Sequence, residues 1–242
     1  MKPPRVVVVI PALDEEEAIG LVVREVPPLA AQVIVVDNGS RDRTAENARA
    51  AGARVVFEPR RGYGQACLTG IAAAEGADVV AFLDGDRSDY PGQLADVLAP
   101  ILAGEADLVI GSRHLGRREK GAHPLHAVWG TRACVGLMNL LLGTKATDLG
   151  PFRAITSSAL ERLGMRDRDF GWTVEMQVKA AGLGLRVREV PVDYRPRLGR
   201  SKVSGTVSGT LRAGSRILAT ILRHAWSRGL RPRATSPFPP AA

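Results

Sequence analysis

The stretch VVAFLDGDRSDYPG, residues 79 to 92, runs from a continuous apolar segment directly into a group of acids. Asp84 and Asp86 flank a glycine immediately after the apolar run, and Asp89 follows three residues later. A short apolar run that is bounded by turn residues is typical of a strand buried in a sheet. The stretch therefore predicts a buried strand that ends in carboxylates which packing alone does not explain.

Four other apolar runs have the same form and predict further buried, parallel strands. They are VVVVI (6–10), VIVV (33–36), RVVF (54–57) and DLVI (107–110). We expect a first helix from Asp14, which pairs with Glu17 as in a capping box, to Pro27, and further helices over 64–75 and after Pro91. Strands that alternate with single helices predict an α/β fold with a mainly parallel sheet and helices on both faces.

In such a sheet, ligands bind outside the carboxyl ends of the strands. Polar groups follow all five predicted strands and should therefore meet at one edge. They are Pro11 to Glu15, Asp37 to Ser40, Glu58 to Arg60, Asp84 to Asp86 and Gly111 to Arg113.

The second half of the chain, 112–204, is less regular than the first half, 1–111. It predicts a helix near 173–181 and a strand near 185–194, without the steady alternation seen before. We expect both halves to form one domain over 1–204.

The composition is that of an ordinary globular protein, with 242 residues of which 45% are hydrophobic. Cys67 and Cys134 lie far apart, without the spacing of a zinc site or a disulfide framework, which predicts reduced thiols in a cytoplasmic protein. The apolar run near the N-terminus is too short for a signal peptide. No segment has the roughly 20 apolar residues of a membrane-spanning helix.

The net charge of +8 is concentrated at the C-terminal end. From Arg186 onward, 12 Lys and Arg oppose two acids, a net charge of +10, which leaves 21 bases and 23 acids for residues 1–185. A cationic segment of this kind indicates an anionic partner, such as phosphates, a lipid surface or nucleic acid.

Within this basic segment, residues 205–229 predict an amphipathic helix, because Arg212, Arg216 and Arg223 share one side of a helical wheel beside several leucines. Such a helix either lies on an anionic membrane surface or packs on its own domain with a solvated basic face. Residues 230–242 are rich in proline and predict a disordered tail.

The acids at the predicted strand ends have alternative explanations. Asp84 and Asp86 could both bind a hard divalent cation, or could belong to a solvated turn. Asp37 could accept a hydrogen bond from a nucleobase or a ribose, since Ser40 already supplies a cap for the following helix. Asp89 precedes a helix start, and we expect it to act as a cap.

Several motifs, taken in order and spacing, resemble those of the family 2 glycosyltransferases, which use a nucleotide-sugar donor on an A-type glycosyltransferase, Rossmann-like fold. They are PALDEEEAI, VVDNGSRDRT, FLDGD and GSR. Two further stretches, TDLGPFRAI (147–155) and EVPVDYRPRLGRSK (189–202), resemble the polyprenyl-phosphate sugar synthase branch, of the dolichyl-phosphate mannose synthase type. The resemblance covers about residues 4–205.

This resemblance implies roles for individual residues. The donor site would comprise Pro11, Leu13, Glu15, Asp37, Asp84, Gly85, Arg197, Ser201 and Lys202. Asp84 and Asp86 would hold Mg²⁺ or Mn²⁺ against the diphosphate, and Arg113 would face the reacting phosphate. Asp148 and Arg153 would lie on the acceptor side. Mannose synthases of this type carry a metal-binding Gln where this chain has Ser88.

Three further residues are candidates because of the chemistry of their side chains, independently of the resemblance. Glu175 is the general base if the acceptor is a neutral hydroxyl, or else a polar residue in the first turn of a helix. Trp172 is either a core residue or a platform for the acceptor, and Arg132 is a candidate acceptor contact.

The function expected from these features is metal-dependent, inverting transfer of a sugar from a nucleoside diphosphate sugar, of the GDP-mannose or UDP-glucose type, to a polyprenyl phosphate at the inner face of a membrane. One alternative is a family 2 enzyme that acts on a hydroxyl of a soluble metabolite or glycan. A nucleotidyltransferase is a weaker alternative, because PALDEEE replaces the glycine-rich loop expected after its first strand. A nucleic-acid-binding module would leave the acids unexplained.

Overall fold

The fold was analysed in a computed structural model, which describes residues 3–122, 125–199, 218–220 and 222. The strands are β1 (Val6–Ala12), β2 (Gln32–Asp37), β3 (Arg54–Phe57), β4 (Val79–Phe82), β5 (Leu108–Ser112), β6 (Arg153–Thr156) and β7 (Val187–Pro191). The α-helices are α1 (Ile19–Glu25), α2 (Thr44–Ala50), α3 (Tyr63–Ala73), α4 (Leu94–Leu102), α5 (Leu125–Leu142), α6 (Ser157–Leu163) and α7 (Trp172–Leu183), and a 3₁₀ turn, η1 (Pro91–Gln93), precedes α4.

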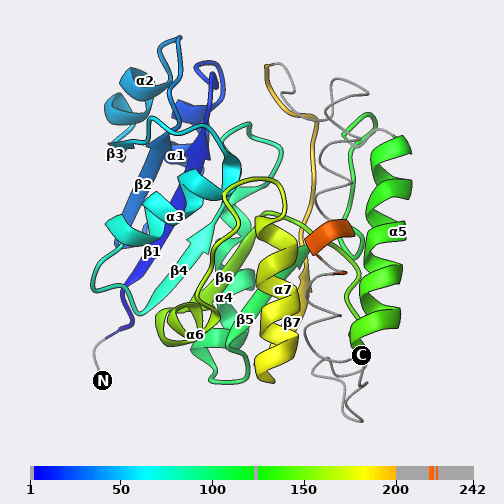
Figure 1. The fold of residues 1–242 in the computed structure, drawn as a ribbon. Helices are drawn as coiled ribbons and strands as arrows, with labels where there is room; N and C mark the ends of the chain where they lie inside the picture. The colour runs from blue at the N-terminus through cyan, green and yellow to red at the C-terminus, as the bar shows by residue number, and fades with distance from the viewer. Residues whose placement is uncertain (1–2, 123–124, 200–217, 221, 223–242) are drawn as a thin grey trace.

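The seven strands form one sheet in the order β3-β2-β1-β4-β6-β5-β7 (Figure 1). All neighbours are parallel except β6, which runs antiparallel to both β4 and β5. The chain winds from β1 towards β3 on one side and continues with β4 on the other side of β1. The carboxyl ends of β1 and β4 therefore lie side by side where the winding reverses, which is the usual ligand site of such sheets.

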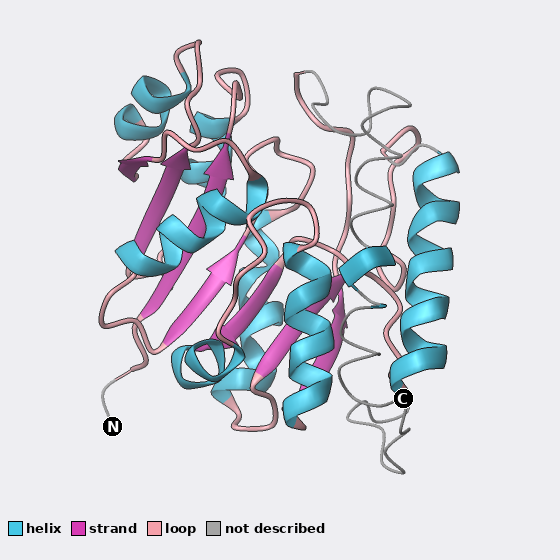
Figure 2. Cartoon of the chain, in the orientation of Figure 1, coloured by secondary structure: helices cyan, strands magenta, loops and turns pink. Residues whose placement is uncertain are grey.

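Helices cover both faces of the sheet (Figure 2). Alternate residues of β1 point to opposite faces, so Val7 and Val9 join a core with residues of α3, α5, α6 and α7, while Val6 and Val8 join a core with residues of α1, α2 and α4. This arrangement confirms the predicted α/β fold. The sheet runs through both sequence halves, since β6 and β7 come from the second.

The five strands predicted in the first half are all present, but β3 is a partly exposed edge strand rather than a buried one, and β6 was not predicted. Helix α1 also begins later than expected. Its first residue is Ile19, and no side chain caps it. The predicted capping box at Asp14 is wrong, because the backbone of Asp14 has a φ of 50° and its carboxylate instead accepts a hydrogen bond from the N–H of Arg41 at 2.7 Å. Helix α6 follows β6 directly and was not predicted.

The predicted basic helix at 205–229 and the tail at 230–242 lie almost entirely outside the described residues. Residues 218–220 and 222 are described, and they are helical. Within the described parts of the chain, none of the helices combines the length and the hydropathy required to cross a membrane.

Close packing of α3 on the sheet gives a test of the fold. A Cβ on Gly70 would lie 2.2 Å from Cγ1 of Val9 and 3.1 Å from Cγ2 of Val36. We expect Gly70→Ala to lower the free energy of unfolding by about 1–3 kcal/mol in urea titrations, because this interface has no room for a methyl group. Gly136→Ala on α5 is the control, since a Cβ there meets nothing within 4 Å, and it should stabilise the protein by up to about 1 kcal/mol.

Candidate active site

A cavity of about 390 Å³ opens at the carboxyl ends of β1 and β4. The residues that line it come from six separate segments of the chain. They are Pro11, Ala12, Leu13, Asn38, Arg61, Gly62, Tyr63, Ala66, Asp84, Gly85, Asp169, Phe170 and Arg197. Five of the predicted donor-site residues are therefore brought together here, namely Pro11, Leu13, Asp84, Gly85 and Arg197.

The loops after β1 and β2 hold each other at the edge of this cavity. The N–H of Asp14 donates to Oγ of Ser40 at 3.0 Å, and the N–H of Glu15 donates to Oγ1 of Thr44 at 2.7 Å. Asp37 is buried at the end of β2 and accepts from the N–H of Ser40 at 2.9 Å. The predicted donor residue Asp37 thus shapes the turn, while its neighbour Asn38 lines the cavity.

Asn38 organises a third loop. Its Nδ2 donates to the carbonyls of Glu58, at 3.0 Å, and Arg60, at 2.6 Å, and its Oδ1 accepts from the N–H of Gly62 at 2.9 Å. One amide side chain therefore satisfies three backbone groups and fixes the segment that contributes Arg61 to the cavity. An ionised carboxylate has no N–H group and could not donate these two hydrogen bonds, so the contacts explain why an asparagine occupies this position.

Three carboxyl groups gather after β4. Tyr63 donates its hydroxyl to Oδ1 of Asp84 at 3.1 Å, and Oδ1 of Asp86 accepts from the N–H of Ser88 at 2.9 Å and from its hydroxyl at 2.6 Å. Burial and the neighbouring charges of Asp86 and Asp89 raise the pKa of Asp84 well above its usual value. The site therefore holds more negative charge than its buried surroundings favour, and a cation would relieve this.

Asp89 does not cap a helix, so that prediction is wrong. Its side chain is buried and turns back towards the strand end, where Oδ2 accepts from the N–H of Asp84 at 3.3 Å. Burial, together with the charge of Asp86, raises the pKa of Asp89 to about 7. No side chain caps the 3₁₀ turn that begins at Pro91.

The donor set suits a divalent cation with an incomplete protein shell. Within the described residues, no three or more His, Cys, Asp and Glu side chains are arranged as a complete metal site. Asp84 and Asp86 supply oxygen ligands of the kind that Mg²⁺ and Mn²⁺ accept, and Mg²⁺ usually completes its shell with phosphate oxygens and water. When bound, such an ion would supply positive charge beside a donor diphosphate.

Arg197 bridges the two sides of the cavity. Its Nη2 lies 2.8 Å from Oε1 of Glu15, and its Nη1 lies 3.3 Å from Oδ2 of Asp86. One guanidinium therefore joins two predicted donor-site residues, Arg197 and Glu15, to the predicted metal ligand Asp86. Ser201 and Lys202, which the sequence places in the same basic loop, lie outside the described residues.

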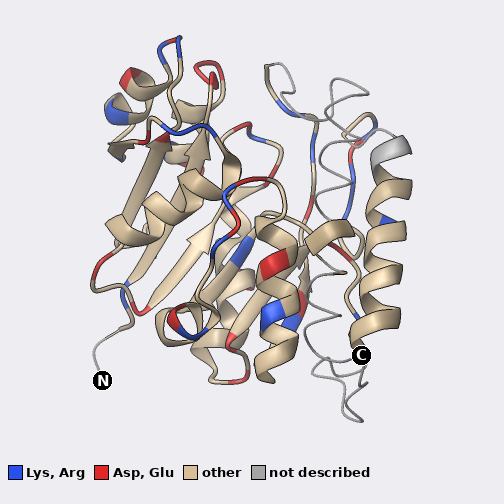
Figure 3. Ribbon diagram, viewed as in Figure 1, with Lys and Arg blue, Asp and Glu red and all other residues tan. Residues whose placement is uncertain are grey.

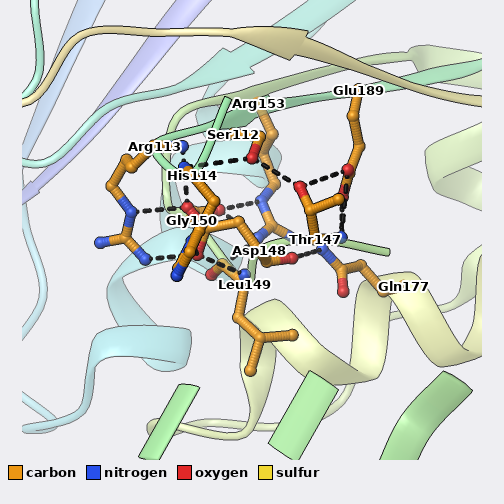
Figure 4. A network of polar contacts seen from close by, with 10 residues as sticks. All are labelled: Ser112, Arg113, His114, Thr147, Asp148, Leu149, Gly150, Arg153, Gln177 and Glu189. Atoms are coloured by element: carbon orange, nitrogen blue, oxygen red, sulfur yellow. Dashed lines mark hydrogen bonds and ion pairs between the residues drawn. The ribbon is translucent and has the colours of Figure 1, made fainter. Parts of the chain in front are cut away.

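Arg113 and Asp148 form a buried, two-pronged ion pair (Figure 4). Nε and Nη2 of Arg113 each donate to Asp148 at 2.7 Å, and the N–H of Arg113 donates to the same carboxylate at 2.9 Å. Burial alone would raise the pKa of Asp148, but the guanidinium outweighs it and holds that pKa well below its usual value. Nδ1 of His114 lies 3.7 Å from Oδ1 of Asp148.

Arg153 supports this ion pair from inside the protein. It is fully buried and donates from Nε to the carbonyl of Gly150 at 3.1 Å and from Nη1 to that of Thr173 at 2.9 Å. Burial lowers the pKa of Arg153 to about 10. The contacts make Arg153 a positioning residue for the turn that carries Asp148.

The opposite side of the same turn is held by Glu189. Its carboxylate accepts from the N–H of Thr147 at 2.9 Å and from Oγ1 of Thr147 at 2.6 Å, and Oγ1 of Thr147 in turn lies 2.6 Å from Oγ of Ser112 (Figure 4). Gln177 donates to the carbonyl of Asp148 at 2.9 Å. Four elements, β5, β6, α7 and β7, therefore fix the position of Asp148.

Three predicted residues lie away from the cavity. Trp172 is fully buried and packs against Phe82, with ring centroids 4.7 Å apart, so its interpretation as an acceptor platform is wrong and it is a core residue. Glu175 lies 2.6 Å from Nζ of Lys179 and also accepts from backbone N–H groups of the preceding loop. Arg132 is on the exposed surface of α5.

The contacts of Glu175 bear on whether it can act as the general base that the sequence suggested. Burial raises the pKa of Glu175, but hydrogen bonds from Lys179 and the backbone outweigh this and lower it. A carboxylate with a lowered pKa and several donors is a weak proton acceptor. Glu175 borders a different cavity, with Arg162, Arg166 and Lys179.

The structure adds residues that the sequence did not single out. Arg61, Tyr63, Asp169 and Phe170 line the cavity, and His114 lies beside Asp148. Tyr63 is the first residue of α3, the helix that follows β3. A residue at that place could have been predicted from the sequence to lie near the carboxyl ends of the strands. Asp169 and Phe170 are brought in by tertiary packing alone.

A mainly parallel sheet with paired carboxylates at its winding reversal defines the A-type glycosyltransferase class of fold and site. Residues 7–164 match the family model described as glycosyl transferase family 2, and the chain belongs to this family. It is a glycosyltransferase.

The chain is similar to several known proteins. It is 40% identical to an uncharacterized glycosyltransferase of Mycobacterium tuberculosis, over 85% of this chain and 93% of the relative. It is 32% identical to the undecaprenyl-phosphate mannosyltransferase of Micrococcus luteus, over 85% and 90%. The glucosyl-3-phosphoglycerate synthase of M. tuberculosis, solved with Mn²⁺, UDP-glucose and phosphoglyceric acid, aligns with a TM-score of 0.74 and 26% identity, covering 92% of this chain and 80% of the synthase.

The buried pair gives a prediction about stability. We expect Asp148→Asn to lower the free energy of unfolding near pH 7 by about 3–5 kcal/mol, because Arg113 loses its buried counter-charge. Folding lowers the pKa of Asp148 from its ordinary value of 3.8, so its contribution is complete above that value and is lost as the pH falls below it. The difference between the two proteins should therefore shrink by about 1.4 kcal/mol per pH unit below pH ~4.

Urea titrations across this pH range measure the effect. Asp107→Asn is the control, because Asp107 pairs at 2.7 Å with the largely exposed Arg186, and its cost should stay below about 1 kcal/mol. A loss from Asp148→Asn that is the same at pH 3 and pH 7 would contradict the assignment.

Proposed function

We propose that this glycosyltransferase moves a sugar from a nucleoside diphosphate sugar to a polyprenyl phosphate, with Mg²⁺ or Mn²⁺ bound at Asp84 and Asp86. The observation that carries the proposal is the arginine at the end of β5. Arg113 is buried, is fixed by Asp148, and lies close enough to Asp84 and Asp89 for its charge to offset part of the rise in pKa that burial and the neighbouring carboxylates cause in each. A fixed guanidinium beside the acids is suited to binding a second anion next to the donor.

The charge of the acceptor side supports a phosphate acceptor. A neutral hydroxyl acceptor requires a general base near the attacking oxygen, whereas a phosphate monoester is already an anion and requires positive charge. Arg113 supplies such charge, while the candidate base Glu175 is engaged by Lys179 at 2.6 Å. Similarity to an undecaprenyl-phosphate mannosyltransferase agrees with this choice.

On the donor side, each group has a clear task. Pro11, Leu13 and Asn38 form the wall of the cavity that would receive the nucleoside. Arg197, already placed between Glu15 and Asp86, would stabilise the negative charge that develops on the departing diphosphate. The nucleobase and the sugar are not assigned.

A phosphorylated soluble acceptor is the second candidate function. It is favoured by the likeness to the synthase that was solved with UDP-glucose and phosphoglyceric acid, at a TM-score of 0.74. Both acceptors carry a phosphate, so the same arginine would bind either one, although the attacking oxygen would belong to the phosphate in a polyprenyl phosphate and to a hydroxyl in phosphoglyceric acid. The size and the solubility of the acceptor distinguish the two candidates.

Transfer assays decide between them. The protein is incubated with Mn²⁺ or Mg²⁺, a panel of labelled UDP- and GDP-sugars, and either a polyprenyl phosphate or phosphoglyceric acid. We expect a lipid-linked sugar whose formation stops with a chelator and in Asp86→Asn, and NMR of its anomeric proton reports whether the configuration is inverted. Transfer only to the soluble acceptor would overturn the proposal.

A lipid acceptor also requires contact with a membrane surface, and α5 supports such contact. Trp129 and Leu140 are 67% and 80% exposed, and Ala133 and Gly136, which are also exposed, complete the same helical stripe. The helix contains one charged residue, Arg132, and most of its ribbon is tan in Figure 3. Cζ of Arg132 lies 5.7 Å from the Trp129 ring centroid, a pairing suited to a membrane interface.

Binding to vesicles tests this surface. We expect the full chain to float with vesicles that contain anionic lipid, and the double substitution Trp129→Ser and Leu140→Ser to reduce the bound fraction severalfold. Phe57→Ser with Leu102→Ser is the matched control, because these side chains are 63% and 53% exposed elsewhere on the protein. Equal binding by both double variants would show that α5 is not the contact.

A further inference from the structure

Residues 86–89, here called the acid turn, carry Asp86 and connect the end of β4 to the segment before η1. Their backbone is strained, because Arg87 has a φ of 65°, in the left-handed region that residues other than glycine rarely adopt. Such a conformation persists only where its surroundings impose it, and it is found most often at functional sites. The acid turn therefore depends on contacts from outside itself.

Those contacts come from one short segment after β7. Arg195 binds three consecutive carbonyls of the acid turn. Its Nε donates to the carbonyl of Arg87 at 2.6 Å, its N–H to that of Ser88 at 3.0 Å, and its Nη2 to that of Asp89 at 3.2 Å. The N–H of Leu198 donates to the carbonyl of Asp86 at 3.0 Å. All four carbonyls of the acid turn are thus held by residues 195–198.

Glu25, the last residue of α1, joins the two arginines. Its Oε1 lies 2.7 Å from Nη2 of Arg87 and accepts from Nε at 2.8 Å, and its Oε2 lies 2.5 Å from Nη2 of Arg195. Arg195 also stacks on Tyr90, with Cζ 4.3 Å from the ring centroid. The three charged side chains are only 14–32% exposed, so they are ordered by several partners at once.

We propose that Glu25, Arg87 and Arg195 form a clamp that positions the acid turn for cation binding, with Glu25 as its central positioning residue. Arg195 holds the backbone of the acid turn, and Arg197, two residues later, carries the guanidinium that reaches Asp86 and Glu15. Loss of the clamp would therefore displace the carboxylate ligand Asp86, whereas Arg197 would keep its second contact, with Glu15.

This inference rests on the proposed metal role of Asp84 and Asp86. It differs from that role because Glu25 does not line the cavity at the ends of β1 and β4. The clamp acts on the geometry of the acid turn, whereas the wall formed by Pro11, Leu13 and Asn38 is built by other loops. Binding of a nucleotide without metal should therefore depend little on Glu25.

The test measures Mn²⁺ directly. Free Mn²⁺ is followed by electron paramagnetic resonance while the full chain is titrated in the presence of UDP or GDP. We expect Glu25→Gln to raise the dissociation constant for Mn²⁺ about tenfold, the equivalent of about 1.4 kcal/mol, and Arg195→Lys to have a similar effect, because an ammonium group cannot replace the guanidinium fork. Calorimetry with UDP or GDP and no metal should show less than a twofold change.

The matched control is Glu46→Gln, which removes a carboxylate from the exposed pair with Arg43 on α2, where the ions are 2.8 Å apart. It should bind Mn²⁺ as the unaltered protein does. In the transfer assay, raising Mn²⁺ tenfold should restore the kcat of Glu25→Gln, which a general loss of folding would not allow. If Glu25→Gln does not fold, Glu25→Asp and Arg87→Lys give the same comparison.

The outcomes are distinct. Mn²⁺ binding by Glu25→Gln that equals that of the unaltered protein would overturn the clamp while leaving the proposed function intact. Equal weakening of Mn²⁺ and metal-free nucleotide binding would also overturn it. If the unaltered protein does not bind Mn²⁺ in the presence of either nucleotide, the proposed metal role fails, and the clamp fails with it.

Discussion

Buried negative charge at the end of β4 is the constraint on which the rest of this site depends. The carboxyl groups of Asp84, Asp86 and Asp89 lie close together away from water, and nearby cations must offset the unfavourable free energy of their mutual repulsion. The surrounding arginines are in turn held by carboxylates from other elements. The pairs are Arg113 with Asp148, Arg197 with Glu15, and Arg195 with Glu25. Each positive group is thus fixed before any substrate arrives.

Preorganisation of this kind is what electrostatic catalysis requires. When charge develops on a leaving group, a guanidinium whose orientation is already fixed needs little free energy of reorganisation. Arg113 is the clearest example, because β5, β6, α7 and β7 all hold Asp148, its counter-ion, in place. The chain belongs to glycosyl transferase family 2, and under the proposed function this fixed guanidinium would serve an acceptor that is itself an anion.

The sequence predicted the five strands of the first half because each contains a continuous run of Val, Ile and similar residues, a property that is local. It did not predict β6, whose four residues, Arg153–Thr156, begin with an arginine and end with a threonine. The sequence did locate the edge of the sheet where Asp84 and Asp86 lie, since strand direction alone decides which ends meet. These two rules locate the strands of the first half and the edge of the sheet at which the cavity opens.

What the sequence did not predict depends on contacts between distant segments. The carboxylate of Asp14 binds a loop 27 residues away instead of capping its own helix. Asp89 turns into the acid cluster, and Trp172 enters the core, because tertiary packing offers each a partner that local spacing cannot reveal. The clamp at Glu25 joins residues 170 positions apart, so no motif could have signalled it.

The position of β6 has a consequence for how this enzyme can change. It is hydrogen-bonded to β4 on one side and to β5 on the other, so the strand that ends in the donor-side acids and the strand that ends in Arg113 are joined by continuous ladders. Within the described residues, the sheet continues from β4 through β6 to β5 without a break in hydrogen bonding. The separation of the two substrates is therefore built into the sheet, and a new acceptor would have to be accommodated by loops and by α5, with the spacing of the reacting groups inherited unchanged.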